Sequence, residues 1–244
     1  MTKKVEQFMQ GKSIFLLVFL VVPLFVNAKG KAKIKVDTTP NPIDGVLTGT
    51  VELNYYNINT DDPVNTLYVN PTIDYSASNG WDIQLASYNV AVVGGGVQNY
   101  QADTYINISK TIPLPKSFFV TLGTQNGITL DGSSKALHNV DYGLLAYQPN
   151  KLFNLHAGAF WANKALTTTT DYIGFTGGFS IEAVPNVLTF TGDYFSGSNN
   201  LSGAVVNTWF RVLPTTQIYL GVGVPETNSG NEFYGAVGFS VSSQ

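Results

Sequence analysis

The feature that most constrains the fold is a strict alternation of apolar and polar residues that recurs along most of the chain. In residues 67–86, LYVNPTIDYSASNGWDIQLA, Leu67 and Ile73 lie on one face, while Asn70 and Asp74 lie on the other. An Asn-Gly turn then separates this run from a second run with the same alternation. A period of two predicts β-strands that have one dry face and one wet face.

Twelve segments between residues 46 and 241 alternate in this way, and most of them span nine to twelve residues. Strands of soluble proteins average about five or six residues, whereas a tilted strand that crosses a bilayer needs about 9 to 11. Short turns with Pro or Asn-Gly alternate with longer polar connections, as in barrels with short periplasmic turns and long outer loops. We therefore expect an all-β fold, a transmembrane antiparallel up-and-down β-barrel of twelve strands, over residues 46–244.

The N-terminus predicts export. Lys3, Lys4 and Lys12 precede an uncharged apolar run over residues 14–26, and Ala28 ends a small-residue cleavage site. These features indicate a signal peptide over residues 1–28, since the apolar run is shorter than the span of about 20 residues that a membrane anchor needs. Residues 29–45 are basic and then Pro-rich, and they are expected to form a periplasmic N-terminal tail.

Composition excludes several classes of function. The chain has no cysteine, so the exported domain has neither disulfides nor thiolate chemistry. Removal of residues 1–28 leaves ten Lys and Arg against fifteen Asp and Glu, which argues against nucleic acid as a partner. Only 12% of the residues are charged, about half the usual share for soluble domains.

The apolar face carries aromatic residues near both ends of the strands, with aliphatic and small residues between them. Aromatic residues prefer the two membrane interfaces, so this pattern favours lipid over a protein core as the surroundings of that face. A soluble β-sandwich would also alternate, but it would not explain aromatic residues at both edges. The expected aromatic girdle comprises Tyr55, Tyr75, Trp81, Tyr100, Phe118, Phe153, Trp161, Tyr194, Phe210, Phe233 and Phe239.

From Val46 to Val241 the chain resembles the outer-membrane β-barrel proteins of Gram-negative bacteria, as a small porin-like barrel. The segments DYFSGSNN (193–200) and PETNSGNEF (225–233) are similar to uncharacterised porin families. The resemblance implies a location in the cell outer membrane, contact with its lipid, and insertion by the barrel-assembly machinery. Two departures are visible: Phe239 is followed by Ser-Val-Ser-Ser-Gln instead of ending the chain, and Pro71 within a strand predicts a bulge.

The polar face would line the lumen, and its charged residues are the candidate selectivity residues. Rings of carboxylates favour cations, so we expect a narrow diffusion channel for small cationic or neutral solutes. In this register Val140 and Tyr142 face lipid, as does His138. The predicted lumen residues are Glu52, Asp74, Asp82, Asp103, Asp141, His156, Glu182, Asp193 and Arg211.

Two alternatives remain within the barrel fold. Arg211 could pair with Glu182 or Asp74 and, with the inward aromatic residues, plug the lumen, because twelve strands lie between filled and open barrels. The protein would then be a structural or adhesive outer-membrane barrel without conductance. An outer-membrane lipid hydrolase would need a serine activated by His138 or His156, and no such pairing is visible in the sequence. No catalytic residue, metal ligand or cofactor site is assigned.

Overall fold

The computed structural model describes residues 45–56, 67–93, 102–130, 137–167, 172–199, 201–227 and 229–243. These residues belong to one compact unit, Gly45–Gln244. The predicted signal peptide, the tail up to residue 44 and Tyr100 lie outside the described residues. Among the described residues, no helix has the length and apolarity needed to span a membrane.

Among the described residues every regular element is a β-strand, and the strands follow the alternating segments of the sequence. They are β1 (Gly45–Tyr56), β2 (Leu67–Ala77), β3 (Trp81–Tyr88), β4 (Val90–Val93), β5 (Ala102–Leu114), β6 (Phe118–Leu130), β7 (Leu137–Asn150), β8 (Phe153–Ala162), β9 (Ile173–Val184), β10 (Leu188–Phe195), β11 (Gly203–Leu213), β12 (Thr216–Pro225) and β13 (Tyr234–Ser242).

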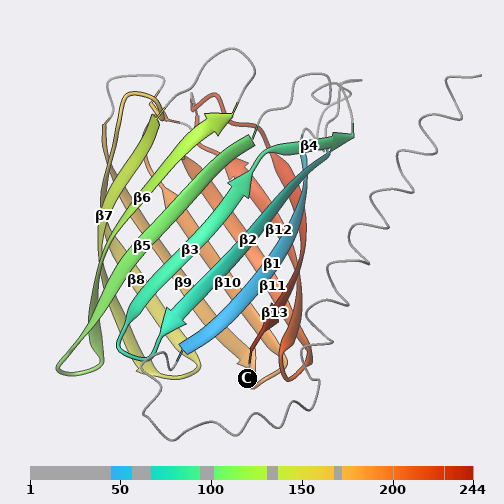
Figure 1. Cartoon of the computed structure of the whole chain (residues 1–244). Coiled ribbons are helices and arrows are strands. Elements are labelled where there is room, and N and C mark those ends of the chain that lie inside the picture. The colour runs from blue at the N-terminus through green and yellow to red at the C-terminus, as the bar shows by residue number, and fades with distance from the viewer. Residues whose placement is uncertain are drawn as a thin grey trace, which may run out of the picture. The chain divides into compact units, whose positions relative to one another are not determined.

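The strands close into an antiparallel up-and-down barrel, because β1 pairs with β13 on one side and with β2 on the other. Figure 1 shows the tilted strands running around the barrel in chain order. Twelve strands form the closed wall, and the short strand β4 is additional. The predicted fold class is confirmed, and closure pairs each of the twelve wall strands on both sides.

Strand β4 continues β3 beyond a bulge opposite Pro71. Thr72 pairs with Ala86 of β3, whereas Val69 pairs with Val90 of β4, so the β3–β4 side carries one extra residue. Asn89 takes a φ of 60° at this break, and its backbone N–H donates to the Asn70 side chain over 2.9 Å. The irregularity predicted at Pro71 is confirmed, since proline has no N–H to offer the ladder.

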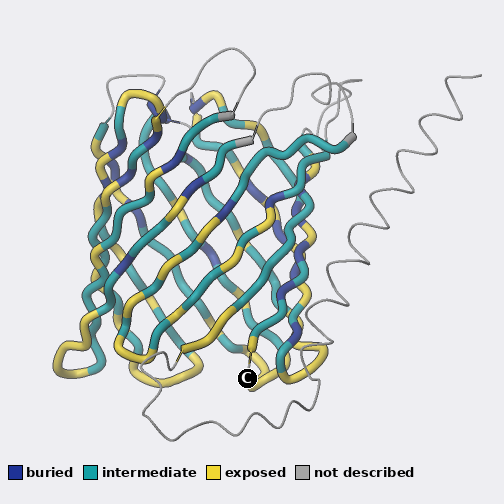
Figure 2. Tube along the Cα trace, in the orientation of Figure 1, coloured by how far each residue is buried: buried dark blue, intermediate teal, exposed yellow. Residues whose placement is uncertain are grey.

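The pairing register separates an outer wall from an inner wall. Ile73, Phe175 and Val222 are exposed on the outer wall, together with most other large apolar side chains. They do not meet in an interior between stacked sheets, so a β-sandwich is excluded. Figure 2 shows exposed residues recurring along the strands and covering the turns at the lower end.

Strand β7 faces the opposite way from the prediction. Leu145 is 50% exposed on the outer wall, whereas Val140 is 5% exposed and packs inside against Phe160. Asp141 therefore lies on the outer wall and His138 on the inner wall, so both predicted orientations were wrong. The orientation of β7 was predicted wrongly because this strand carries apolar residues on both faces, and the adjacent Leu144 and Leu145 fit either orientation.

Aromatic rings on the inner wall lie over glycines of neighbouring strands. Tyr219 of β12 pairs with Gly238 of β13, and Tyr105 of β5 pairs with Gly127 of β6. A Cβ at Gly238 would lie 1.8 Å from the Tyr219 ring. Each glycine thus makes the space that lets a ring lie along the wall, so these rings do not need to project into the lumen.

We predict that Gly238→Ala destabilises the barrel by about 1–3 kcal/mol, because the added methyl group displaces a well-packed ring. Unfolding in urea, followed by heat-modifiable gel mobility, measures the change. Gly143→Ala is the matched control, since its Cβ would meet no atom closer than 3.4 Å. Equal stability of the two variants would contradict the packing role of the glycine.

Candidate functional site

The inner wall of the barrel is the candidate site, and the register places eight of the nine predicted lumen residues on it. The exception is Asp141, which shares the outer wall with Trp161, its partner across β8. Among the described strands, six carboxylates therefore face inward against one arginine, with His138 and His156 as the inward histidines. The inward carboxylates are Glu52, Asp74, Asp82, Asp103, Glu182 and Asp193.

Glu52 joins three strands around the seam where the barrel closes. Its Oε1 accepts a 3.0 Å hydrogen bond from Asn70 Nδ2 of β2, and its Oε2 accepts one from the Tyr219 hydroxyl of β12. The Tyr219 bond reaches across Gly238 of β13, which has no side chain in the way. Glu52 is thus a hydrogen-bonded part of the wall as well as a negative charge.

A second network connects four strand segments near the long-loop end. Asn89 Nδ2 donates to Asp103 Oδ2 over 3.2 Å, and the Thr129 hydroxyl donates to Asp103 Oδ1 over 2.6 Å. Thr129 Oγ1 also lies 2.9 Å from His138 Nε2, while the Tyr105 hydroxyl lies 2.5 Å from His138 Nδ1. If Tyr105 donates to Nδ1, the Nε2 proton points to Thr129, and every polar group of the network is satisfied.

Sequence analysis missed His138 as an inner-wall residue because it misjudged the register of β7. One available signal was Gly127 of β6, a small residue opposite His138 that makes room for a cross-strand contact. The ring of Tyr105 occupies the space above this glycine, and the Tyr105 and His138 rings lie 5.6 Å apart.

His156 and Asp193 lie within hydrogen-bonding distance of each other across β9. His156 Nε2 lies 3.1 Å from Asp193 Oδ1, above Gly178, which pairs with both residues. The His156 side chain is 22% exposed and the Asp193 side chain 45% exposed. Both lie on the inner wall, so the lumen beside them has room for water.

Two carboxylates lie together near the short-turn end of the lumen. The Ser76 hydroxyl lies 3.1 Å from Asp74 Oδ1 and 2.6 Å from Asp82 Oδ2, and Gln84 Nε2 donates to Asp74 Oδ2 over 3.4 Å. The described part of the chain contains no cluster of three His, Asp or Glu residues that could hold a metal ion. The Asp74 and Asp82 carboxylates contribute negative charge at one mouth of the barrel.

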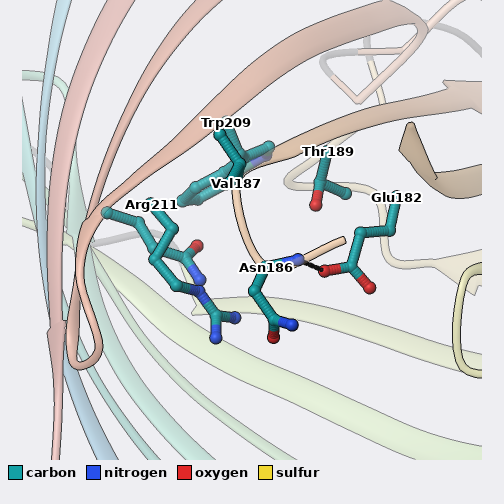
Figure 3. A pocket seen from close by; sticks show the side chains of 7 residues that line it. Glu182, Asn186, Val187, Thr189, Trp209 and Arg211 are labelled. Carbon is teal, nitrogen blue, oxygen red and sulfur yellow. Dashed lines mark hydrogen bonds between the residues drawn. The ribbon is translucent and has the colours of Figure 1, made fainter. Parts of the chain in front are cut away.

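Arg211 lies at the same end, in a small pocket beside the β9–β10 turn (Figure 3). Glu182 lines this pocket too, but its carboxylate accepts from the backbone N–H of Asn186. In the described part of the chain, Arg211 forms no ion pair with Glu182 or Asp74. The proposed Arg211 cross-link of the plugged-barrel alternative is thus not formed, and Arg211 is exposed.

Two loop leucines extend an apolar cluster of the inner wall at the long-loop end. Leu166, from the segment after β8, is 3% exposed and packs against Val140 and Phe160 of the inner wall. Leu201, from the segment before β11, packs against the same cluster. We call Leu166 and Leu201 the mouth leucines, because they cover the inner wall of β7 and β8 at the long-loop end.

Hydrogen bonds hold the loops around this mouth. Asn163 donates its backbone N–H to Asn139 O over 2.9 Å, which fixes the start of the Leu166 segment. Asn231 Nδ2 donates to Ser202 O over 2.8 Å, and Ser202 Oγ donates to Ser196 O over 3.1 Å. The Leu166 segment is therefore bonded to β7, and the Leu201 segment is bonded to the residues that follow β10 and to those that precede β13.

The predicted girdle residues lie on the outer wall wherever they fall within a described strand. Phe233 precedes β13. The structure adds Tyr147, whose ring lies 4.9 Å from Phe118, and Lys110, whose Nζ lies 5.2 Å from the Trp81 ring. Contact of these rings with membrane interfaces stays a prediction.

The sequence matches no protein-family model and no curated protein. Among solved structures, the fold is similar to that of the NanC porin, with a TM-score of 0.56 and 13% identity over 80% of this chain and 99% of that one. It is also similar to the KdgM porin solved with oligogalacturonate, with a TM-score of 0.56 and 10% identity over 82% of this chain and 99% of that one.

A third similar structure is an active-site mutant of outer membrane phospholipase A from Escherichia coli. Its TM-score is 0.52 and its identity 10%, over 85% of this chain and 94% of the phospholipase. At these identities the likeness establishes the fold alone. Channels and a lipid hydrolase share this barrel, so function has to be argued from the inner and outer walls of this chain.

We predict that Thr129→Val destabilises the barrel by about 1–3 kcal/mol, because Asp103 and His138 each lose a hydrogen-bond partner on the inner wall. Thermal unfolding in detergent measures the change. Thr208→Val is the control, since Thr208 lies on the outer wall of β11, where an apolar side chain is favourable. A loss no larger than that of the control would contradict the network.

Proposed function

We propose that this protein is an outer-membrane channel for passive diffusion of small cationic or neutral solutes. The observation that carries the proposal is the closed barrel whose inner wall is polar and reaches water, with the Asp193 side chain 45% exposed inside it. Several inner aromatic rings lie over glycines, which supports a lumen that is not filled by its own side chains.

The solute preference follows from the charge of the inner wall. Six inward carboxylates face one arginine in the described strands, so the lumen attracts cations and repels anions. The KdgM porin was solved with oligogalacturonate, a polymer that carries a carboxylate on each sugar. Such an anionic ligand is disfavoured by the excess of inward carboxylates in this lumen.

A barrel that does not conduct is the second candidate, and the mouth leucines favour it. They cover part of the inner wall at the long-loop end, where an apolar constriction can exclude water. Against it, Arg211 is exposed and makes no cross-link to Glu182 or Asp74 within the described residues.

A lipid hydrolase is less well supported, although the phospholipase has a similar fold. Nucleophilic catalysis needs a serine within hydrogen-bond reach of a histidine base. His138 is engaged by Tyr105 and Thr129, and His156 by Asp193. Both histidines thus belong to hydrogen-bonded networks of the inner wall. The channel proposal also includes export by the signal peptide and insertion by the barrel-assembly machinery.

Single-channel recording in planar bilayers tests the proposal. We expect discrete current steps and a reversal potential in a KCl gradient that indicates cation preference. Asp74→Asn combined with Asp82→Asn lowers this preference severalfold, because it removes two carboxylates from one mouth. Arg211→Gln raises it, since it removes the inward positive charge. No current from folded protein would contradict the channel, and shifts in the same direction would contradict the charge argument.

We predict that Leu166→Ala and Leu201→Ala increase the unitary conductance, because each shortens a side chain that narrows the long-loop mouth. Leu152→Ala is the matched control, since Leu152 is exposed in a short turn at the other end. Permeation of neutral polyethylene glycols of graded size gives an independent measure of the opening. Unchanged conductance and size cut-off in both variants would place the constriction elsewhere.

A further inference from the structure

Glu52 is a half-buried carboxylate of the inner wall for which the described residues provide no positive partner. Its two hydrogen bonds come from neutral donors, Asn70 Nδ2 and the Tyr219 hydroxyl. Arg211 is the inward arginine, but it lies on β11, which is three strands from β1 around the seam. Because a charge that is partly removed from water costs free energy unless it is paired, a cation in the lumen would stabilise this side of the wall.

Tyrosine rings gather beside Glu52 on its long-loop side. The Tyr56 ring of β1 lies 5.1 Å from the Tyr68 ring of β2 and 5.1 Å from the Tyr234 ring of β13, measured between centroids. The Glu52 carboxylate interacts electrostatically with the hydroxyl groups of Tyr56, Tyr234 and Tyr88 of β3. All four tyrosines are half-buried and lie on the inner wall. We call Glu52 and these four tyrosines the tyrosine cluster.

The wall opposite the tyrosine cluster carries several small side chains. In the closed order of twelve strands, β8 lies halfway around the barrel from β1. Strand β8 presents Gly158 to the lumen, and its neighbour β9 presents Thr176 and Gly178. The tyrosine rings on one side of the lumen thus face a side with short side chains, so a small solute has room to lie against the rings.

Aromatic rings beside an unpaired carboxylate favour one class of cation. The face of an aromatic ring is electronegative and attracts cations, and quaternary ammonium groups are bound in this way because their methyl groups pack against the rings. The Glu52 carboxylate adds the attraction of a full negative charge. We propose that the tyrosine cluster binds the methylated ammonium group of small organic cations. This site rests on the proposed channel function, because the ligand reaches it through the lumen.

Other solutes use only part of the tyrosine cluster. An alkali-metal ion in water keeps its hydration shell, so it gains charge attraction from Glu52 but little packing against the rings. A neutral saccharide can stack on the rings and donate its hydroxyl groups to Glu52, but it leaves the negative charge uncompensated. An anion is repelled by Glu52. A methylated ammonium ion is served by the rings and by the charge together.

Isothermal titration calorimetry of the folded protein in detergent, with choline as the probe, tests the proposal. The wild type is expected to bind choline more tightly than 3,3-dimethyl-1-butanol, which has the same shape without the charge. Tyr56→Leu and Glu52→Gln are each expected to weaken choline binding about tenfold, because one removes a ring and the other the charge. Phe119→Leu is the matched control, since Phe119 is an inner-wall ring of β6 outside the tyrosine cluster, and it retains wild-type binding.

Heat-modifiable gel mobility checks that each variant is folded. Equal affinity of the wild type for choline and for its uncharged analogue would overturn the proposal, as would wild-type choline binding by folded Tyr56→Leu and Glu52→Gln. Tighter binding of maltose than of choline would assign the tyrosine cluster to saccharides instead. The titration needs no membrane current, so the two proposals fail separately. Protein that conducts KCl without binding choline contradicts the site alone, and protein that binds choline without conducting contradicts the channel alone.

Discussion

The pairing of β1 with β13 is the interaction on which the rest of the structure depends. A strand exposed to lipid cannot leave its backbone N–H and C=O groups unpaired, because the hydrocarbon offers no hydrogen bonds in exchange. Closure pairs the first strand with the last from Thr48↔Ser242 to Tyr56↔Tyr234. Thr48 and Ser242 also bond through their hydroxyls on the inner wall, as do Thr50 and Ser240. The serines that follow Phe239 therefore belong to the seam.

Closure also creates the two environments that give the walls their chemistry. The outer wall is apolar, while the inner wall carries neutral hydrogen-bonding groups, carboxylates and tyrosines. Glycines on the inner wall let side chains reach across a whole strand, as Tyr219 reaches Glu52 over Gly238 and His156 reaches Asp193 over Gly178. These contacts fasten alternate strands together and hold several rings along the wall, which favours a lumen with room for solute.

The ends of the barrel differ in character. The short-turn mouth combines the Asp74 and Asp82 carboxylates with an exposed Arg211, so charge dominates there. At the long-loop end, the apolar mouth leucines cover part of the inner wall on hydrogen-bonded loops. In the proposed channel, selection by charge and selection by size would thus act at opposite ends.

Period-two alternation in the sequence determined the strands, their length and the barrel class. It also determined the inward direction of eight charged residues, because a shift of one residue would exchange the two faces of a strand. The bulge at Pro71 could also be predicted from the sequence, since the missing backbone N–H of proline is a local property. Three features needed the tertiary structure. Strand β7 carries apolar residues on both faces, so the sequence does not show which face points into the barrel. Packing of Val140 against Phe160 places Val140 on the inner wall and therefore Asp141 on the outer wall. The His138 network and the mouth leucines join residues far apart in the chain, and a sequence pattern carries no information about which strands and loops closure brings together.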